Sequence, residues 1–224
     1  MKNKINRFER KWVFKSKNYL ALINSLLRSE LFFINQYPSR KVNSIYFDDL
    51  NFSSVRENLD GISNKKKIRV RWYGIKNKLT KPQLEIKSKK GAETSKKNYS
   101  INELNDLKFF DAKNLDKINY LVNYKIKSKK KLNPLLSTHY DRQYFISNDK
   151  KIRATVDYNL QSIFLNNLSQ LNIVKNFNKV CIMELKYPTK LDMHVREKLK
   201  NITLRLTKNS KFVNSAFERP IFFS

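Results

Sequence analysis

The sequence predicts an α+β fold built on an antiparallel β-sheet, with charged side chains on one face and helices packed against the other. Two observations predict this class. Several segments alternate between charged and apolar residues, as "KKKIRVRWYG" (65–74) does, and a strand places successive side chains on opposite faces. Other segments carry apolar residues at helical spacing, which suits them to cover the apolar face. The chain has 224 residues and no Pro/Gly/Ser-rich linker, so we expect a single domain over residues 1–224.

The first half of the chain is predicted to alternate strands with helices. "NRFERKWVF" (6–14) alternates charged and apolar residues and is predicted to be a strand. A helix is predicted from Ser16 to about Phe33, because Leu20, Ile23, Leu27 and Leu31 recur at helical spacing. The next elements are a strand over 41–49, a short helix or turn over 52–61 closed by Gly61, and strands over 66–73 and 81–90. "SINE" (100–103) matches a capping box, which predicts that a helix begins there.

The second half repeats this mixture. A helix is predicted around Leu115, Ile118 and Val122. "LSTHYDRQYFIS" (136–147) and "KKIRATVDYNL" (150–160) are predicted to form a hairpin, and residues 161–175 a helix or loop. "KVCIMELKYP" (179–188) is predicted to be a strand, ended by its proline, and the residues after it a helix that carries Leu191, Val195 and Leu199.

The charge of the chain narrows the classes of ligand. Lys and Arg number 47 against 19 Asp and Glu, a formal net charge of +28. Such a field attracts polyanions, and the candidates are nucleic acid, anionic lipid and polyphosphate-like substrates. A base-composition bias of the genome toward Lys and Asn codons also explains part of the total. It does not explain why Arg69 and Arg71 share one face of a strand.

Several classes of site are excluded by residue types that are scarce. Cys181 is the single cysteine, so the chain forms no intrachain disulfide and no cysteine-based zinc site. His139 and His194 are too few for a histidine-rich metal site. No apolar run reaches the length of about 18 residues that spans a bilayer, and the charged N-terminal stretch lacks a signal-peptide core. We therefore expect a soluble protein of the cytoplasm.

Acidic residues share the cationic faces of three predicted strands. Glu9, Glu85 and Glu184 each lie two residues before a lysine. One interpretation is a sheet whose charged face is simply wetted by solvent. The other is a barrel with helices outside, whose interior is a cationic tunnel with a few carboxylates. Such a tunnel suits a chain of phosphates, because guanidinium groups bind phosphate oxygens in pairs and carboxylates hold Mg²⁺ or Mn²⁺.

A set of motifs in this sequence resembles one family. The motifs, in chain order, are "RFERKW", "SIYFDD", "ENLDG", "KIRVRWYG", "LEIKSKKG", "YDR", "TVDYNL", "ELKYP" and "SKFVNSA". They resemble the VTC domain, the polyphosphate polymerase module of the vacuolar transporter chaperone complex, within the triphosphate tunnel metalloenzyme superfamily that also contains the CYTH phosphatases. The resemblance covers essentially the whole chain. It implies an antiparallel β-barrel of about eight strands that forms a cationic tunnel, with helices outside. It also implies synthesis of polyphosphate from ATP with a divalent metal, Mn²⁺ or Mg²⁺.

The resemblance also implies roles for individual residues. The catalytic tunnel cations that hold the triphosphate and the growing chain are expected to be Lys11, Arg69, Arg71, Lys87 and Arg142. Further phosphate contacts are expected from Lys186, Ser210, Lys211 and Lys97, or Lys96 beside it. Glu184 is expected to be the metal carboxylate, with Glu85 and Glu9 assisting it or pairing with tunnel cations. Asp157 is expected to pair with Arg153 or a tunnel cation, or to bind metal.

The chain departs from the related patterns at two places. CYTH enzymes begin with Glu-x-Glu-x-Lys, whereas this chain has Arg7, Glu9 and Lys11 at those positions. The missing carboxylate favours the VTC branch over a triphosphatase. Asn58 lies where the family is expected to carry a basic side chain, which predicts weaker or differently tuned substrate binding.

Other functions stay open at this point. One alternative is that the same tunnel hydrolyses triphosphate or polyphosphate. Two others are that the tunnel binds polyphosphate without turnover and that the chain is a protein scaffold. A nucleic-acid-binding protein is a further alternative, with Trp72, Tyr73 and Tyr99 as stacking residues unless they pack under helices. We expect ATP and inorganic polyphosphate as partners and no specific nucleic acid. A membrane-protein partner and the oligomeric state stay open.

Overall fold

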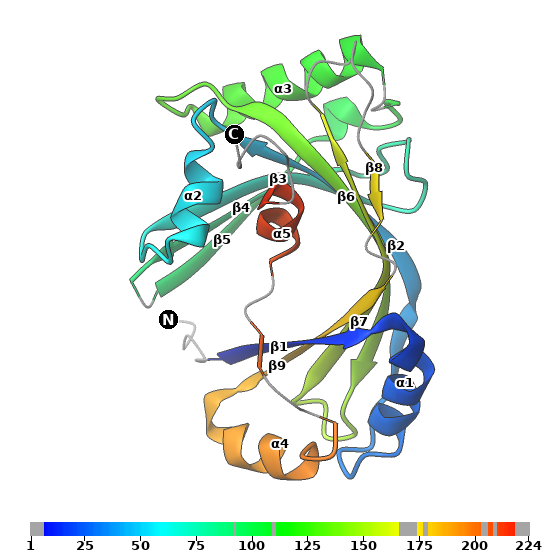
Figure 1. The fold of residues 1–224 in the computed structure, drawn as a ribbon. Coiled ribbons are helices and arrows are strands. Elements are labelled where there is room, and N and C mark those ends of the chain that lie inside the picture. The colour runs from blue at the N-terminus through cyan, green and yellow to red at the C-terminus, as the bar shows by residue number, and fades with distance from the viewer. Residues whose placement is uncertain are drawn as a thin grey trace. The chain divides into compact units, whose positions relative to one another are not determined.

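The computed structural model describes residues 7–91, 93–108, 111–165, 174–176, 179–202, 206–207 and 210–217. The strands form an antiparallel sheet in the order β1-β9-β7-β6-β2-β3-β4-β5, with β8 paired to β7 (Figure 1). The strands are β1 (Arg7–Lys15), β2 (Ile34–Asp48), β3 (Lys65–Tyr73), β4 (Gln83–Lys90), β5 (Glu93–Ser100), β6 (Asn133–Ile146), β7 (Arg153–Phe164), β8 (Val174–Asn176) and β9 (Val180–Pro188). The helices are α1 (Tyr19–Leu27), α2 (Ser53–Leu59), α3 (Ala112–Ile126), α4 (Asp192–Lys198) and α5 (Lys211–Phe217). The predicted α+β class, with an antiparallel sheet and helices on its apolar face, is confirmed.

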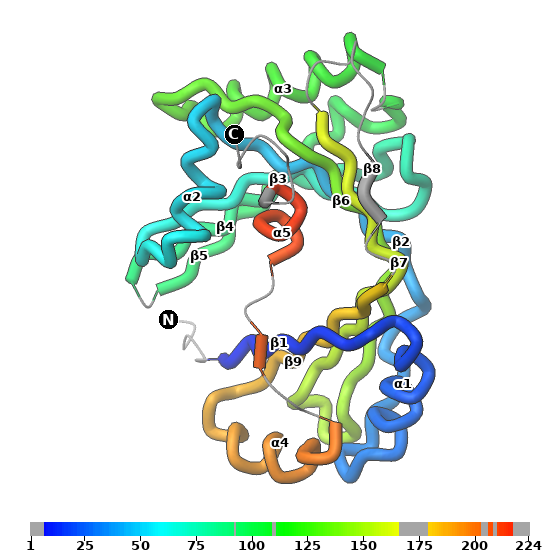
Figure 2. The backbone as a smooth tube through the Cα atoms, in the orientation of Figure 1, coloured from blue at the N-terminus to red at the C-terminus, as the bar shows by residue number. Residues whose placement is uncertain are grey.

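The chain divides into two compact units. Unit 1 comprises Met1–Arg40, Tyr140–Leu160 and Phe177–Asn209, and unit 2 comprises Lys41–His139, Gln161–Asn176 and Ser210–Ser224. The strands β2, β6 and β7 each contribute residues to both units, as their continuous traces in Figure 2 show. A single domain over the whole chain stays a prediction.

Unit 1 is built on the pairing of the first strand with the last. In this antiparallel pair Arg7 lies opposite Pro188 and Lys15 opposite Val180, and β9 pairs in turn with β7. Figure 1 shows β1 and β9 side by side, followed along the chain by α4. The apolar face of these strands is covered by α1 and α4. The buried residues of this core include Trp12, Leu22, Leu26, Val156, Met183, Leu185, Val195 and Leu199.

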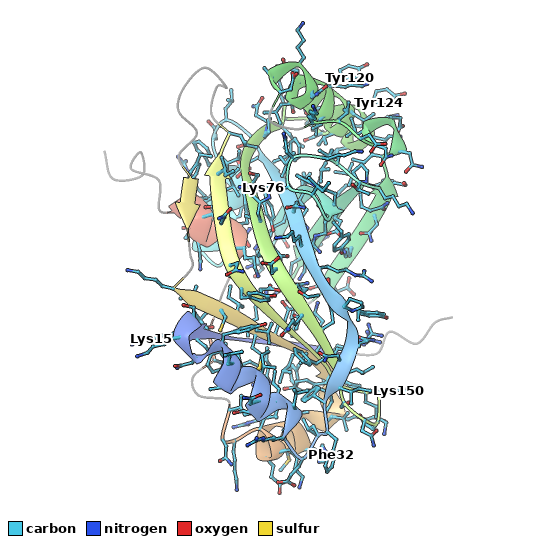
Figure 3. All side chains as sticks on the ribbon, turned by 90° about the vertical axis from the view of Figure 1, so that its right-hand side faces the viewer. Lys15, Phe32, Lys76, Tyr120, Tyr124 and Lys150 are labelled. Carbon is cyan, nitrogen blue, oxygen red and sulfur yellow. The ribbon has the colours of Figure 1, made fainter. Side chains whose placement is uncertain are left out.

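Unit 2 is built on consecutive antiparallel strands. In the register of β2, β3 and β4, Ile45 lies opposite Val70 and Val70 opposite Leu84, so one face is continuously apolar. Helix α3 covers this face with Leu115, Ile118 and Val122. The carboxylate of Asp111 accepts hydrogen bonds from the backbone N–H groups of Lys113 and Asn114, which caps the start of α3. Tyr120 and Tyr124 project from the exposed side of the same helix (Figure 3).

Two further helices of unit 2 lie on the other face of the sheet. Val55 of α2 and Phe212 of α5 are buried together with Tyr46 of β2. Tyr46 lies opposite Arg69 in the β2–β3 register, so these helices share the charged face. The two helices contact each other. Ser210 and helix α5 are therefore brought to the charged side chains of β3.

The structure differs from the predicted elements in the first third of the chain. Helix α1 ends at Leu27 and not near Phe33, because Phe32 has a positive φ of 49° that no α-helix accommodates. Strand β2 then begins at Ile34, earlier than the predicted start at residue 41. Leu31 matches the helical spacing although it lies after the end of α1, because it packs in the core of unit 1 from the turn that follows the helix.

Three further differences lie later in the chain. Strand β5 (Glu93–Ser100) was not predicted, because all its residues are exposed and no apolar alternation marks it. "SINE" does not begin an α-helix, since only the single 3₁₀ turn Asn102–Leu104 forms there. Residues 161–164 continue β7 and are not a helix or loop, while 166–173 lie outside the described residues. No helix in the described part of the chain is long and apolar enough to cross a bilayer.

Candidate functional site

The charged face of unit 2 centres on one buried carboxylate. Glu85 lies opposite Arg69 in the β3–β4 register, and antiparallel neighbours share a face. Arg69 Nε donates to Glu85 Oε2 at 2.7 Å, and Lys96 Nζ donates to Glu85 Oε1 at 2.9 Å. Arg71 NH1 lies 3.8 Å from the same Oε2 atom. One carboxylate therefore aligns three cations contributed by β3 and β5.

These cations keep Glu85 ionised. Burial alone would raise the pKa of this carboxyl, but the charges of Arg69, Arg71 and Lys96 outweigh it and lower the pKa to about 2. Glu85 is only 7% exposed, so its contacts with the cations are weakly screened by water. The ionised carboxylate of Glu85 therefore holds the two arginines in place.

Tyr46 extends this cluster on the neighbouring strand. Arg69 NH1 donates to Tyr46 Oη at 3.1 Å, and the Tyr46 ring stacks on Phe212 with centroids 4.9 Å apart. Burial would raise the pKa of Tyr46, but Arg69, Arg71 and Lys211 overcome that effect and lower the pKa to about 8. A phenol with a pKa this low records a strong positive potential at its oxygen.

The start of α5 adds two predicted residues to the same face. Lys67 Nζ donates to Ser210 Oγ at 2.9 Å, and Ser210 Oγ also accepts from the backbone N–H of Val213 at 3.3 Å. Lys211 follows directly and contributes to the potential at Tyr46. Lys87 lies opposite Lys67 in the register and is exposed. The structure thus brings Arg69, Arg71, Lys87, Ser210 and Lys211 to one face of unit 2.

The expected position of Lys97 on this face is wrong. Lys97 lies opposite Ile86, whose side chain is in the apolar core. Lys96 lies opposite Lys87 and contacts Glu85, so it occupies the position expected of Lys97. The physical reason is the strict alternation of faces along a strand, which separates two adjacent lysines.

The charged face of unit 1 carries a closed set of ion pairs. Lys11 Nζ lies 3.1 Å from Glu9 Oε1 and 3.5 Å from Glu184 Oε2. Lys186 Nζ lies 2.8 Å from Glu184 Oε1 and 3.9 Å from Glu9 Oε2. The β1–β9 register creates this arrangement, since it sets Lys11 opposite Glu184 and Glu9 opposite Lys186. Two carboxylates and two lysines therefore alternate around a small square.

The pKa shifts follow from these contacts. Burial lowers the pKa of Lys11, but Glu184 and Glu9 outweigh burial and the net shift is upward. Burial raises the pKa of Glu184, as does the neighbouring Glu9, but Lys11 and Lys186 hold it below its usual value. All the groups whose pKa shifts are resolved here stay charged at neutral pH.

Arg142 makes the strongest ion pair of unit 1. Its Nε and NH2 atoms donate to the two carboxylate oxygens of Asp157 at 2.5 and 2.8 Å, a bidentate arrangement. Asp157 is 1% exposed. Burial would lower the pKa of Arg142, but Asp157 raises it well above its usual value. Asp157 therefore pairs with a predicted phosphate-binding cation, which is one of the roles expected of it.

The sequence matches the family described as the VTC domain over residues 6–217. This chain belongs to the VTC domain family. No curated protein matches the sequence. Structural similarity to proteins of known structure is clear although their sequence identity is low, and it shows the fold alone.

Three solved structures resemble this VTC domain over nearly their full length. A candidate adenylate cyclase from Bacillus halodurans is 15% identical with a TM-score of 0.54, and the match covers 94% of this chain and 96% of that one. A candidate adenylate cyclase from Vibrio parahaemolyticus is 14% identical with a TM-score of 0.53, covering 94% and 98%. A candidate adenylyl cyclase from Hippeastrum, with a dominant triphosphatase activity, is 14% identical with a TM-score of 0.51, covering 96% and 99%.

The carboxylates of the VTC domain differ in how well they suit a metal ion. Among the described residues, no group of three His, Cys, Asp or Glu side chains gathers as a ready-made metal site. Glu9 and Glu184 suit Mg²⁺ or Mn²⁺, because such ions take one or two carboxylates and complete their shell with phosphate oxygens and water. Lysines contact Glu9 and Glu184, whereas two arginines and Lys96 contact Glu85, and arginines stay charged at any accessible pH, so Glu85 suits a metal less well. We therefore replace the expected pair Glu184 and Glu85 by Glu184 and Glu9.

Several aromatic and polar residues of unit 2 have structural roles. Trp72 is fully buried and donates from Nε1 to Ile75 O at 3.0 Å, so it does not stack on a base. Asn58 donates to Ser54 O at 2.7 Å within α2. His139, which the sequence suggested to be a surface or incidental residue, is buried in unit 2, and burial lowers its pKa to about 3. Only the two polar residues near it, at positions 137 and 138, hinted at a polar site there.

Proposed function

We propose that this VTC domain is a polyphosphate polymerase that transfers the γ-phosphoryl group of ATP to the end of a polyphosphate chain, with Mn²⁺ or Mg²⁺ as cofactor. The observation that carries the proposal is the arginine pair Arg69 and Arg71 held in place by Glu85. Guanidinium groups fixed by a carboxylate lose little conformational entropy on binding, and they match phosphate oxygens in geometry and charge. ATP and inorganic polyphosphate are the proposed partners.

The reaction conserves the number of phosphoanhydride bonds. A terminal oxygen of the polyphosphate attacks the γ-phosphorus of ATP, the bond from that phosphorus to the β,γ-bridging oxygen breaks, and ADP leaves with the electron pair. The chain gains one phosphate. The attacking oxygen is already ionised near neutral pH, so no strong general base is required. The described histidine in the core, His139, fits that view, since burial keeps its imidazole neutral and bonded to Asn43 and Ser137.

Unit 2 is proposed to bind the phosphates. Arg69 and Arg71 would bind the oxygens of the transferred group, where negative charge accumulates. Lys67, Lys87 and Lys96 would bind neighbouring phosphates along the chain. Preorganised cations of this kind act mainly by positioning and electrostatic stabilisation, which are the main sources of rate in phosphoryl transfer.

Unit 1 is proposed to supply further phosphate contacts and the metal ligands. Lys11, Lys186 and Arg142 are its cations, each already bound to a carboxylate. Glu184 and Glu9 would hold the divalent ion, which neutralises phosphate charge when it is bound. The lysines between these carboxylates would then be available to phosphate oxygens.

A second candidate function is hydrolysis of triphosphate or polyphosphate by water. The observation that favours it is the dominant triphosphatase activity of the Hippeastrum protein, which shares the fold. The same charged faces would serve both reactions, and only the acceptor would differ.

The experiment that tests the proposal separates the products. Purified protein is incubated with ATP, Mn²⁺ or Mg²⁺ and a short polyphosphate primer, and a gel resolves chain length while released phosphate is measured. We expect lengthening chains in the wild type. Arg71→Ala should lower the rate by about 100-fold or more, because one fixed cation in an active site contributes that much.

The matched control is Arg28→Ala, which removes an exposed arginine next to α1. It should leave elongation unchanged, and circular dichroism should show both variants folded. Phosphate release without lengthening would overturn the polymerase in favour of the hydrolase. Tight polyphosphate binding with neither product would leave a binding module, and full activity of Arg71→Ala would overturn the assigned site.

A further inference from the structure

A pocket lies on the face of β1 opposite to the charged cluster of unit 1. It has a volume of about 410 Å³, which is within the range of small-molecule sites. Its lining residues are Arg10, Trp12, Tyr187, Val195, Arg196, Lys200 and Leu206. Arg10 and Trp12 alternate with Glu9 and Lys11 along β1, so the strand separates this pocket from the proposed phosphate-binding face.

The charges around the pocket are unbalanced. Arg10 NH2 lies 2.7 Å from Asp192, which also accepts a hydrogen bond from Tyr187 Oη at 2.7 Å. Asp192 therefore neutralises Arg10. Arg196 and Lys200 remain, both exposed, with Arg196 in the last turn of α4 and Lys200 just after the end of that helix. The lining residues thus present a surplus of positive charge suited to a dianion.

Two buried donors at the pocket have no acceptor among the described residues. They are Trp12 Nε1 and Arg10 Nε. Trp12 is 5% exposed, so its N–H is not satisfied by bulk water. A buried donor without an acceptor costs about 1–3 kcal/mol, and in a native structure such a group calls for a partner such as a bound water, ion or ligand.

The rest of the lining is apolar or aromatic. Val195, Leu206 and the ring of Trp12 offer a surface for a flat or hydrophobic group. Small-molecule sites commonly combine such walls with a few convergent polar groups that orient the ligand.

We propose that this pocket binds a small phosphomonoester that carries an aromatic group, the chemical class of nucleoside monophosphates. Arg196 and Lys200 bind the phosphate dianion, the N–H groups of Trp12 and Arg10 donate to its oxygens, and the aromatic group lies against Val195 and Leu206. The site is independent of the proposed polymerase reaction, since it uses none of the side chains assigned to that reaction.

The experiment uses the two tryptophans of the chain as reporters. A ¹H–¹⁵N spectrum shows one indole signal each for Trp12 and Trp72, and Trp12→Phe assigns them. AMP is titrated to millimolar concentration, with inorganic phosphate and adenosine as separate probes. We expect a saturable downfield shift of the Trp12 indole proton with AMP, because a new acceptor deshields it. The Trp72 signal should not move, since its N–H already donates to Ile75.

Arg196→Ala/Lys200→Ala should weaken AMP binding about tenfold or more, because two charge-assisted contacts are lost. The matched control, Lys17→Ala/Arg28→Ala, removes the same charge from exposed positions of unit 1 that do not line the pocket, and should bind AMP as the wild type does. Arg71→Ala should also bind AMP normally, so loss of polymerase activity and loss of this site are distinguishable. No shift at millimolar AMP, or equal binding by Arg196→Ala/Lys200→Ala, would overturn the proposal. A response to adenosine equal to that with AMP would overturn the phosphate assignment.

Discussion

The charged faces of the two units balance their cations in different ways. In unit 2 a single buried carboxylate, Glu85, holds Arg69, Arg71 and Lys96, and further lysines lie on the same face. In unit 1 three carboxylates contact cations of the charged face, with Glu9 and Glu184 between two lysines and Asp157 on Arg142. The cations on the charged face of unit 2 therefore have less counter-charge than those of unit 1.

This difference indicates which partner each face requires. Cations held close together with little counter-charge destabilise the protein until an anion binds, so the unit 2 face is suited to phosphate itself. The unit 1 face carries more counter-charge, and its paired carboxylates would allow a divalent cation and a phosphate to bind together. The predictions below test this contrast.

The largest effect is expected on stability. Glu85→Ala should lower the free energy of unfolding by about 3 kcal/mol, because two arginines lose their common carboxylate in a buried place. Glu184→Ala should cost only about 1 kcal/mol, because Glu9 remains near both lysines, at 3.1 Å and 3.9 Å in the present structure. Urea denaturation in phosphate-free buffer measures both. Equal losses of unfolding free energy in the two variants would show that the cations of both faces depend on their carboxylates to the same degree.

The next effect concerns the metal. Glu184→Gln should weaken Mn²⁺ binding in the presence of polyphosphate by about 10- to 100-fold, as loss of a metal-site carboxylate commonly does. Glu85→Gln should leave Mn²⁺ affinity unchanged, because its carboxylate serves arginines. Calorimetric titration measures both affinities. A loss of Mn²⁺ affinity in Glu85→Gln alone would restore Glu85 as the metal ligand.

Titration of the Tyr46 phenol reports the electrostatic potential at the charged face of unit 2. Its pKa of about 8 in the folded chain lies below the value of about 10 expected in the unfolded chain. The folded state then binds fewer protons than the unfolded state between these pH values, so Tyr46 adds stability that is complete above about pH 10 and is lost as pH falls through 8. The phenolate also competes with phosphate for Arg69.

We therefore expect polyphosphate affinity to fall about tenfold more in the wild type than in Tyr46→Phe between pH 7 and 9.5. Tyrosinate absorbance of the wild type minus that of Tyr46→Phe should show a component with its midpoint near 8. Bound polyphosphate should shift that midpoint upward. Identical titration of the two proteins would mean that the potential at Tyr46 is weak.

The smallest effect separates two adjacent lysines. Lys96→Ala should weaken polyphosphate binding by about two- to fivefold, the usual range for an exposed charge contact. Lys97→Ala should change it little, because Lys97 lies on the other face of β5. Equilibrium binding at constant ionic strength compares the two. A larger loss in Lys97→Ala would contradict the observed β4–β5 register.

Much of the fold follows from local alternation. Arg69 and Arg71 alternate with Val70 and Trp72, and that pattern predicted both the strand and the side of the sheet on which the cations lie. The same argument placed Glu184 and Lys186 together on β9. Such predictions succeed where one face of a strand is buried, because burial imposes the period of two.

The remaining features depend on pairing between distant segments. Strand β5 has no buried face, so nothing in its sequence marks it or chooses between Lys96 and Lys97. The contact of Ser210 with Lys67 arises from packing of α5 and α2 against Tyr46, which no local pattern predicts. The bidentate pair of Arg142 and Asp157 depends on how β6 lies beside β7. These contacts required the tertiary structure.

The pairing of β1 with β9 also bears on how the protein is made. Arg7 and its partner Pro188 lie far apart in the sequence, so Arg7 emerges from the ribosome long before Pro188 is synthesised. The hairpins of β3, β4 and β5 in unit 2 form between neighbouring segments and can assemble during translation. Unit 1 cannot form until β9 has been synthesised, so the apolar side of β1 stays exposed until then. A nascent chain stalled before Val180 would therefore have the hairpins of unit 2 formed and the apolar side of β1 exposed. Chaperones that bind hydrophobic segments would be expected to bind β1 at that stage.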